Sequence, residues 1–88
     1  MNFRWNAWNI EHVAEHGVSP KQVEWVVRTV RWPYPEGRVN GEYCIRGADR
    51  GGLLLQVIYV LDPDGTIYVI HARPLTDREK KQLRRRRS

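Results

Sequence analysis

One stretch of the chain, "VIHARPLTDREKK" over residues 69–81, holds an imidazole, a guanidinium and a carboxylate close together. Metal-independent cleavage of RNA needs such a set. A base takes the 2′-hydroxyl proton, a cation stabilises the charge of the phosphorane, and an acid protonates the leaving 5′-oxygen. His71, Arg73 and Glu79 are the candidates for these roles. The residues alone leave a second interpretation open, in which Arg73 and Glu79 form a surface ion pair and His71 is a half-buried strand residue.

Basic residues concentrate in the same part of the chain. Residues 73–88 hold eight Lys or Arg against two acidic residues, and residues 1–72 hold seven against eight, so the net charge of +5 divides into +6 and −1. Clusters of this kind bind phosphate backbones or acidic protein partners. We expect a single domain over residues 1–83 and a basic tail over residues 84–88. The alternative for the arginine run at 84–87 is a solvated, partly disordered tail.

A strand and a helix must position the candidate residues. Alternation along "TIYVIHAR" places Val69, His71 and Arg73 on one face of a strand. Thr76 and Glu79 match a capping box, so a helix is expected from about residue 77. A strand end that leads directly into a helix start would bring the charged side chains of both elements together.

The remainder of the chain predicts an α+β domain. Residues 2–5 alternate as a short edge strand, and a helix that stops at a glycine is expected over "NAWNIEHVAEHG". Ser19 as N-cap, Pro20 at the first helical position and a stripe of valines predict a second helix over about residues 20–30. After an irregular "RWPYPEG" segment come three extended runs, joined by the turn sequences "ADRGG" and "PDG". The expected fold is a short N-terminal strand, two helices, a three-stranded antiparallel meander and a C-terminal helix, with helices packed on one face of the sheet.

The sequence "HVAEH" matches H-x-x-E-H, an inverted zinc-protease pattern, with His12 and His16 one helical turn apart. Zinc hydrolysis also needs a third protein ligand, and His71 is the only other histidine of the chain. In the alternative interpretation, His16 ends the helix and His12 packs near Trp8. We expect no metal site and no other cofactor.

Further features narrow the class of protein. Cys44 is the only cysteine, so the chain has no internal disulfide framework. The longest apolar run, residues 53–61, is too short to span a bilayer, and no signal pattern begins the chain, so a cytoplasmic protein without membrane segments is expected. The chain has four tryptophans, each of which could bury a large area and stabilise a small core: Trp5, Trp8, Trp25 and Trp32.

The chain resembles the BrnT family of type II toxin–antitoxin ribonucleases over about residues 3–83. The matching parts are "FRWN", "HGVS" between the two helices, "GR" before a strand that ends in "IRG", the strand "LLLQVIYV", and above all "IHARPLTDREKK". The resemblance implies a RelE/ParE-like α+β fold and an endoribonuclease that cleaves RNA and arrests growth. It also implies a cognate antitoxin that neutralises the toxin in a hetero-oligomer and represses the shared operon.

Carried over by position, the resemblance assigns functional roles to Arg73 and Glu79. Arg73 is expected to bind phosphate and stabilise charge, and Glu79 is either a general base or the group that orients Arg73. His71 is a candidate acid or base, because an imidazole titrates near neutral pH. Arg46, at the end of one strand, and Arg50, just before the central hydrophobic strand, are expected to bind RNA.

The basic residues that follow the glutamate are expected to add phosphate contacts: Lys80, Lys81, Arg84 and Arg85. The chain departs from the family pattern at Leu83, where a tyrosine is common, and at Glu15, where a lysine commonly precedes "HG". The alternative function is a non-catalytic toxin-like module that binds a protein partner or nucleic acid through its basic C-terminal helix.

Overall fold

The computed structural model describes residues 1–87, apart from the side chain of Arg87. In chain order the elements are β1 (Phe3–Arg4), α1 (Ala7–Ala14), α2 (Pro20–Thr29), β2 (Glu36–Gly37), β3 (Tyr43–Ala48), β4 (Leu54–Leu61), β5 (Ile67–Pro74) and α3 (Asp77–Arg87). The strands form one five-stranded sheet in the order β1-β5-β4-β3-β2, with β1 parallel to β5 and the other neighbours antiparallel. The predicted α+β fold, with its N-terminal edge strand, two helices, antiparallel meander and C-terminal helix, is confirmed.

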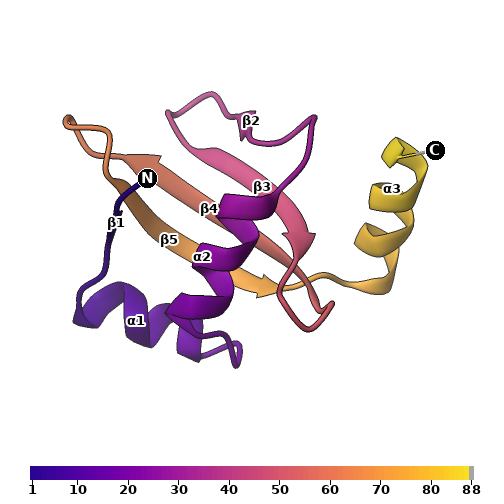
Figure 1. The fold of residues 1–88 in the computed structure, drawn as a ribbon, viewed down its shortest axis with the longest axis horizontal. Coiled ribbons are helices and arrows are strands. Elements are labelled where there is room, and N and C mark those ends of the chain that lie inside the picture. Colours follow the sequence, from indigo (N-terminus) through magenta and orange to yellow (C-terminus); the bar gives the residue numbers. More distant parts are fainter. Residues whose placement is uncertain (88) are drawn as a thin grey trace.

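Helix α2 lies across the sheet and α1 lies along β5, while α3 stands beyond the far end of β5 (Figure 1). Capping boxes fix the start of each helix. In α1 the buried side chain of Asn9 also donates hydrogen bonds to the backbone oxygens of Arg4 and Val69, at 3.0 and 3.1 Å. This amide therefore ties α1 to both β1 and β5. Among residues 1–87, no helix is long and apolar enough to cross a membrane.

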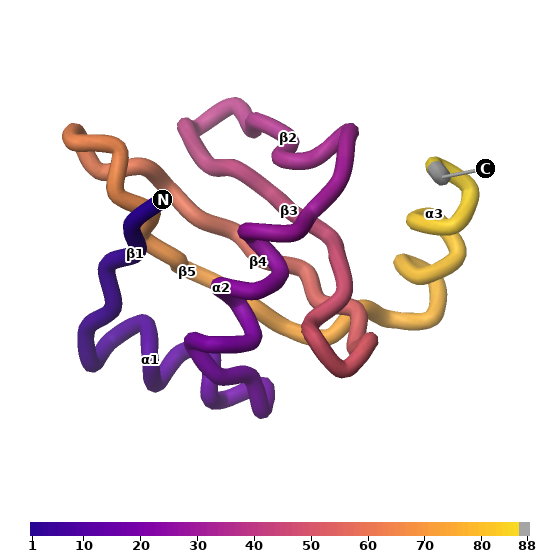
Figure 2. Tube along the Cα trace, in the orientation of Figure 1, coloured from indigo at the N-terminus to yellow at the C-terminus, as the bar shows by residue number. Residues whose placement is uncertain are grey.

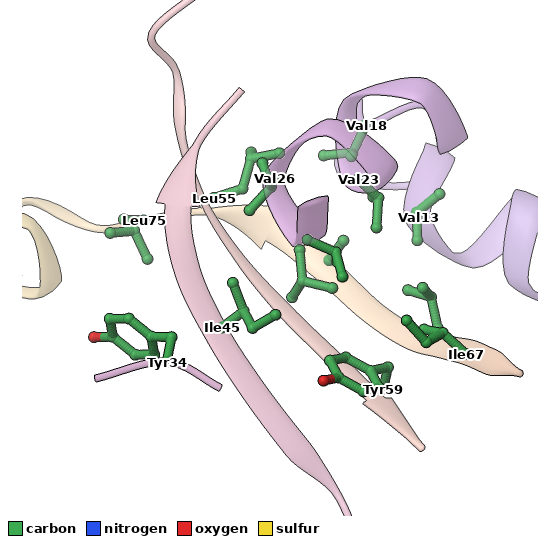
Figure 3. Close-up of a cluster of buried hydrophobic side chains, with 14 of the residues drawn as sticks. Val13, Val18, Val23, Val26, Tyr34, Ile45, Leu55, Tyr59, Ile67 and Leu75 are labelled. Carbon is green, nitrogen blue, oxygen red and sulfur yellow. The ribbon is translucent and has the colours of Figure 1, made fainter. Parts of the chain in front are cut away.

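The hydrophobic core lies between the first two helices and the sheet (Figure 3). Val13 and Val26 from the helices meet Ile45 and Leu55 from the strands, and each is at most 1% exposed. Tryptophans contribute less than expected. Trp5 packs against this core, but three tryptophans are well exposed: Trp8 at 53%, Trp25 at 40% and Trp32 at 87%. The buried aromatic residues of the core cluster are instead Tyr34 and Tyr59.

A β-bulge in β5 changes which face of the sheet carries the candidate residues. Tyr59 of β4 pairs with Val69, but the preceding residue, Ile58, pairs with His71, so Ile70 is an extra residue in β5. The prediction that Val69 and His71 share a face is therefore wrong. Val69 faces the core, whereas His71 and Arg73 lie on the opposite face of the sheet.

Two buried leucines attach the C-terminal helix α3 to the domain, one just before the helix and one within it. Leu75 precedes α3 and is 5% exposed, and Leu83 within it is 2% exposed; both belong to the core cluster. Helix α3 continues to Arg87, so the boundary expected at residue 83 does not coincide with a helix end (Figure 2). The short strand β2 lies at the end of the segment expected to be irregular, and Glu36 pairs there with Cys44.

Candidate functional site

Two neighbouring rungs of the sheet carry the site, on the face opposite the core. In one rung Arg46 of β3 lies opposite Gln56 of β4, which lies opposite Arg73 of β5. The next rung has Ile58 between Cys44 and His71. Because successive residues on one face of a strand are two positions apart, the rungs are separated by roughly 7 Å.

Glu79 of α3 joins the two arginines of the first rung. Arg73 donates two parallel hydrogen bonds to its carboxylate, from Nη1 to Oε1 at 2.7 Å and from Nη2 to Oε2 at 2.8 Å. Arg46 adds a bond from Nη2 to Oε2 at 3.1 Å, and the backbone N–H of Thr76 adds one to Oε1 at 2.9 Å. We call Arg46, Arg73 and Glu79 the arginine–glutamate cluster.

These hydrogen bonds bear on the two roles considered for Glu79. The bonds from Arg73, followed by those from Thr76, lower the pKa of Glu79 to about 2. A carboxylate with so low a pKa, and with both oxygens already occupied, is a poor proton acceptor at neutral pH. The geometry therefore favours Glu79 as the group that orients the guanidinium groups.

The guanidinium groups are held on more than one side. Arg46 donates from Nε to Oε1 of Gln56 at 3.1 Å and from Nη1 to Oε1 of Gln82 at 3.1 Å. Arg73 donates from Nη1 to the backbone oxygen of Pro74, and its bonds to Glu79 raise the pKa of its guanidinium. Both side chains remain partly exposed, at 20% for Arg46 and 27% for Arg73. They are fixed cations with access to solvent, which suits them to bind phosphate.

All three histidines of the chain come together beside this cluster. The ring of His71 lies 6.2 Å from that of His12 and 5.6 Å from that of His16, between ring centroids. Burial lowers the pKa of His71 below its usual 6.5, and the charges of Arg73, His16, His12 and Arg38 lower it further. The lowered pKa favours the uncharged form of the His71 ring at pH 7, and a general base acts in that form.

The histidines do not form a metal site of the kind that "HVAEH" suggested. Within the described part of the chain, no group of three or more His, Cys, Asp or Glu side chains has a geometry that could hold a metal ion. His12 instead stacks on Trp8, with ring centroids 4.8 Å apart, in agreement with the alternative interpretation of that residue.

The other expected RNA-binding residues are spread over different places. Arg50 lies in the turn between β3 and β4, where its guanidinium carbon is 5.3 Å from the centre of the Trp25 ring, so it does not belong to the cluster. Lys80 lies 3.9 Å from Asp77 on the same helix. The remaining three are exposed residues of α3: Lys81, Arg84 and Arg85.

Two glutamines of the site were not predicted. Gln56 is 5% exposed and interrupts the apolar strand "LLLQVIYV", which is the signal that could have identified it. Gln82 lies one helical turn after Glu79, and nothing in the sequence distinguishes it from a solvent-exposed helix residue. Both amides hold Arg46.

Comparison with protein-family models, with curated proteins and with solved structures finds no match for this chain. The fold and the site together define an α+β domain that presents two hydrogen-bonded guanidinium groups beside an imidazole.

Proposed function

We propose that this chain is a toxin-type endoribonuclease, similar to the BrnT family and the RelE/ParE-like class, that cleaves RNA in the cytoplasm without a metal ion and arrests growth. A cognate antitoxin would neutralise it in a hetero-oligomer. The observation that supports this function is the convergence of Arg46 and Arg73 on Glu79, one rung away from the imidazole of His71. Fixed cations next to a proton acceptor are what phosphodiester cleavage through the 2′-hydroxyl group requires.

In the proposed reaction, His71 takes the proton of a 2′-hydroxyl group, and the 2′-oxygen attacks the adjacent phosphorus. The bond between phosphorus and the 5′-oxygen breaks, which leaves a 2′,3′-cyclic phosphate, and the 5′-oxygen takes a proton from water. Arg73 and Arg46 bind the phosphate and stabilise the charge that develops on the phosphorane. Glu79 takes no proton and keeps both guanidinium groups in place.

The second candidate is a non-catalytic module that binds a protein partner or nucleic acid through α3. It is favoured by the pairing of Arg73, whose guanidinium already donates two charge-assisted hydrogen bonds to Glu79. A phosphate must compete with that carboxylate, or share the remaining N–H donors of Arg73.

Induced expression of the wild type, Arg73→Ala and Arg28→Ala, followed by growth and total-RNA integrity, tests the proposal. Arg28 is a matched control, because it is a 53% exposed arginine that also has a carboxylate partner, Glu24, at 3.6 Å on α2. We expect growth arrest and RNA cleavage with the wild type and Arg28→Ala, and neither with Arg73→Ala. Undiminished toxicity of Arg73→Ala would contradict the assignment. Purified wild type that binds RNA but never cleaves it would favour the binding module.

A further inference from the structure

A groove of about 830 Å³ lies apart from the arginine–glutamate cluster. Its walls come from α2, from the turn that follows α2, from the end of β3 and from α3. Trp25 and Trp32 line it together with Arg31 and Arg86, and Asp49 lies at its β3 end. We call it the tryptophan groove.

The two indoles of the groove are exposed to water. Trp32 is 87% exposed and Trp25 is 40% exposed, although tryptophan is usually largely buried. Exposed apolar side chains that gather in one hollow mark a contact surface. The flat faces of the indoles suit a ligand that also has flat faces.

Arginine side chains lie in and next to the groove. Arg31 and Arg86 line it directly, and the guanidinium of Arg50 lies over the Trp25 ring at 5.3 Å. Arg86 also pairs with Glu36, which places it between β2 and the groove. The groove therefore combines aromatic faces with positive charge.

The acidic residue of the groove is engaged within its own loop. Oδ1 of Asp49 accepts hydrogen bonds from the backbone N–H groups of Gly51 and Leu53, both at 2.9 Å. Its Oδ2 accepts a bond from Nε2 of Gln22, also at 2.9 Å. Asp49 thus shapes the turn between β3 and β4, and its oxygens are directed to these donors.

The chemistry of the lining argues against an apolar helix as the occupant. Among the lining residues the aliphatic ones are Val30 and Ala48, so the groove lacks the aliphatic floor on which an amphipathic helix packs. Aromatic platforms flanked by guanidinium groups are instead the combination that binds unstacked bases and the phosphates between them.

We propose that the tryptophan groove binds a single-stranded segment of RNA, with bases stacked on Trp32 and Trp25 and phosphates held by Arg31 and Arg86. The choice of RNA rests on the proposed function. Helix α3 connects the groove with the cluster, because Arg86 follows Glu79 by two turns on the same helix face, roughly 10 Å along the axis. A strand that occupies the groove and continues along α3 would lead to Glu79 and its partner Arg73.

The test is fluorescence anisotropy with a labelled single-stranded RNA of roughly ten nucleotides. Its 2′-hydroxyl groups are methylated, so that binding is measured without cleavage. Trp32→Ala should weaken binding roughly ten-fold without changing its salt dependence, because stacking contributes no ionic contact. Arg31→Gln should lower the slope of log K against log salt by about 0.7, as expected when one phosphate contact to a single strand is lost. The control is Leu61→Ala, which truncates a 47% exposed apolar side chain at the end of β4, outside both the groove and the cluster, and should leave binding unchanged.

RNA binding that is unchanged in Trp32→Ala would overturn the proposal that the tryptophan groove binds RNA. If the wild type still cleaves RNA in a separate assay, the proposed function stands independently of the groove. Conversely, loss of binding in Trp32→Ala supports the groove even if the wild type cleaves no RNA, which would count against the proposed function alone. If an acidic peptide binds more tightly than the RNA, and Trp32→Ala weakens its binding to the same extent, RNA is not the ligand of the groove. The groove would then be a protein-docking site.

Discussion

Gln56 accepts a hydrogen bond on its side-chain oxygen from Nε of Arg46, at 3.1 Å, on the sheet face opposite the core. The glutamine is 5% exposed and lies in the middle of an otherwise apolar strand. A buried amide is tolerated in such a place when it is hydrogen-bonded. Arg46 also donates to Glu79, so Gln56 helps to hold this guanidinium group between the sheet and α3. We expect Gln56 to matter more for RNA cleavage than for the stability of the sheet.

Gln56→Leu tests whether Gln56 contributes to RNA cleavage, to the stability of the sheet, or to both. Leucine has a similar volume and matches the apolar strand, so we expect the free energy of unfolding to stay within about 1 kcal/mol of wild type. Cleavage of RNA should fall roughly ten-fold, because Arg46 loses the bond that positions it. Urea unfolding and a cleavage assay on the same preparation check both parts. A loss of stability above about 2 kcal/mol would instead make Gln56 a structural residue.

Glu79→Gln separates an orienting role from a proton-transfer role. The variant should cleave RNA roughly a hundred-fold more slowly, because both guanidinium groups lose their charged partner. The pH at which the rate rises should stay the same, since Glu79 has a pKa of about 2 and remains ionised across the assay range. A rate profile measured from pH 5 to 8 checks this, with Asp77→Asn as control, because Asp77 is a 98% exposed carboxylate of the same helix. Disappearance of the pH dependence in Glu79→Gln would make Glu79 the base.

The titration of His71 should respond to Arg73. Burial is the main cause of the lowered pKa of His71 and the positive charge of Arg73 is the next. Arg73→Gln removes that charge, so the protonated imidazole becomes less unfavourable and the pKa of His71 should rise toward 6.5 while staying below it. NMR titration of the His71 ring protons measures the change. Arg28→Gln, at an exposed arginine on α2, should leave the titration unaltered. An unshifted pKa of His71 in Arg73→Gln would show that the charge of Arg73 does not contribute to the lowering.

The helices and their starts could be predicted because their signals are local. Ser19 with Gln22 and Thr76 with Glu79 form the capping boxes expected from their spacing, and the second helix begins at Pro20 as predicted. Such contacts lie within four residues, so the sequence contains both partners side by side. The hairpin order of the meander follows from its short connections for the same reason.

The direction of the candidate side chains could not be predicted, because it depends on pairing between strands. Ile70 is the extra residue of the bulge, yet no glycine or proline marks it, and strict alternation along "YVIHAR" places His71 on the wrong face. Likewise, both Arg46 and Arg50 were predicted to bind RNA from their places in the sequence. The register between β3 and β4 places Arg46 beside Gln56, whereas Arg50 lies in the turn, over the ring of Trp25.

Leu83 is the buried leucine within α3 itself, and its truncation should loosen the site as well as the fold. Leu83 is 2% exposed, so Leu83→Ala removes buried apolar surface and is expected to lower the free energy of unfolding by about 2–3 kcal/mol. Glu79 and Gln82 lie on the same helix and reach Arg46 only while α3 is docked, so RNA cleavage should fall with it. Urea unfolding measures the first effect, with Leu53→Ala as control, because Leu53 is 42% exposed and its truncation should change stability by less than about 1 kcal/mol. Equal stability of the two variants would mean that α3 is held by its ion pairs and not by Leu83.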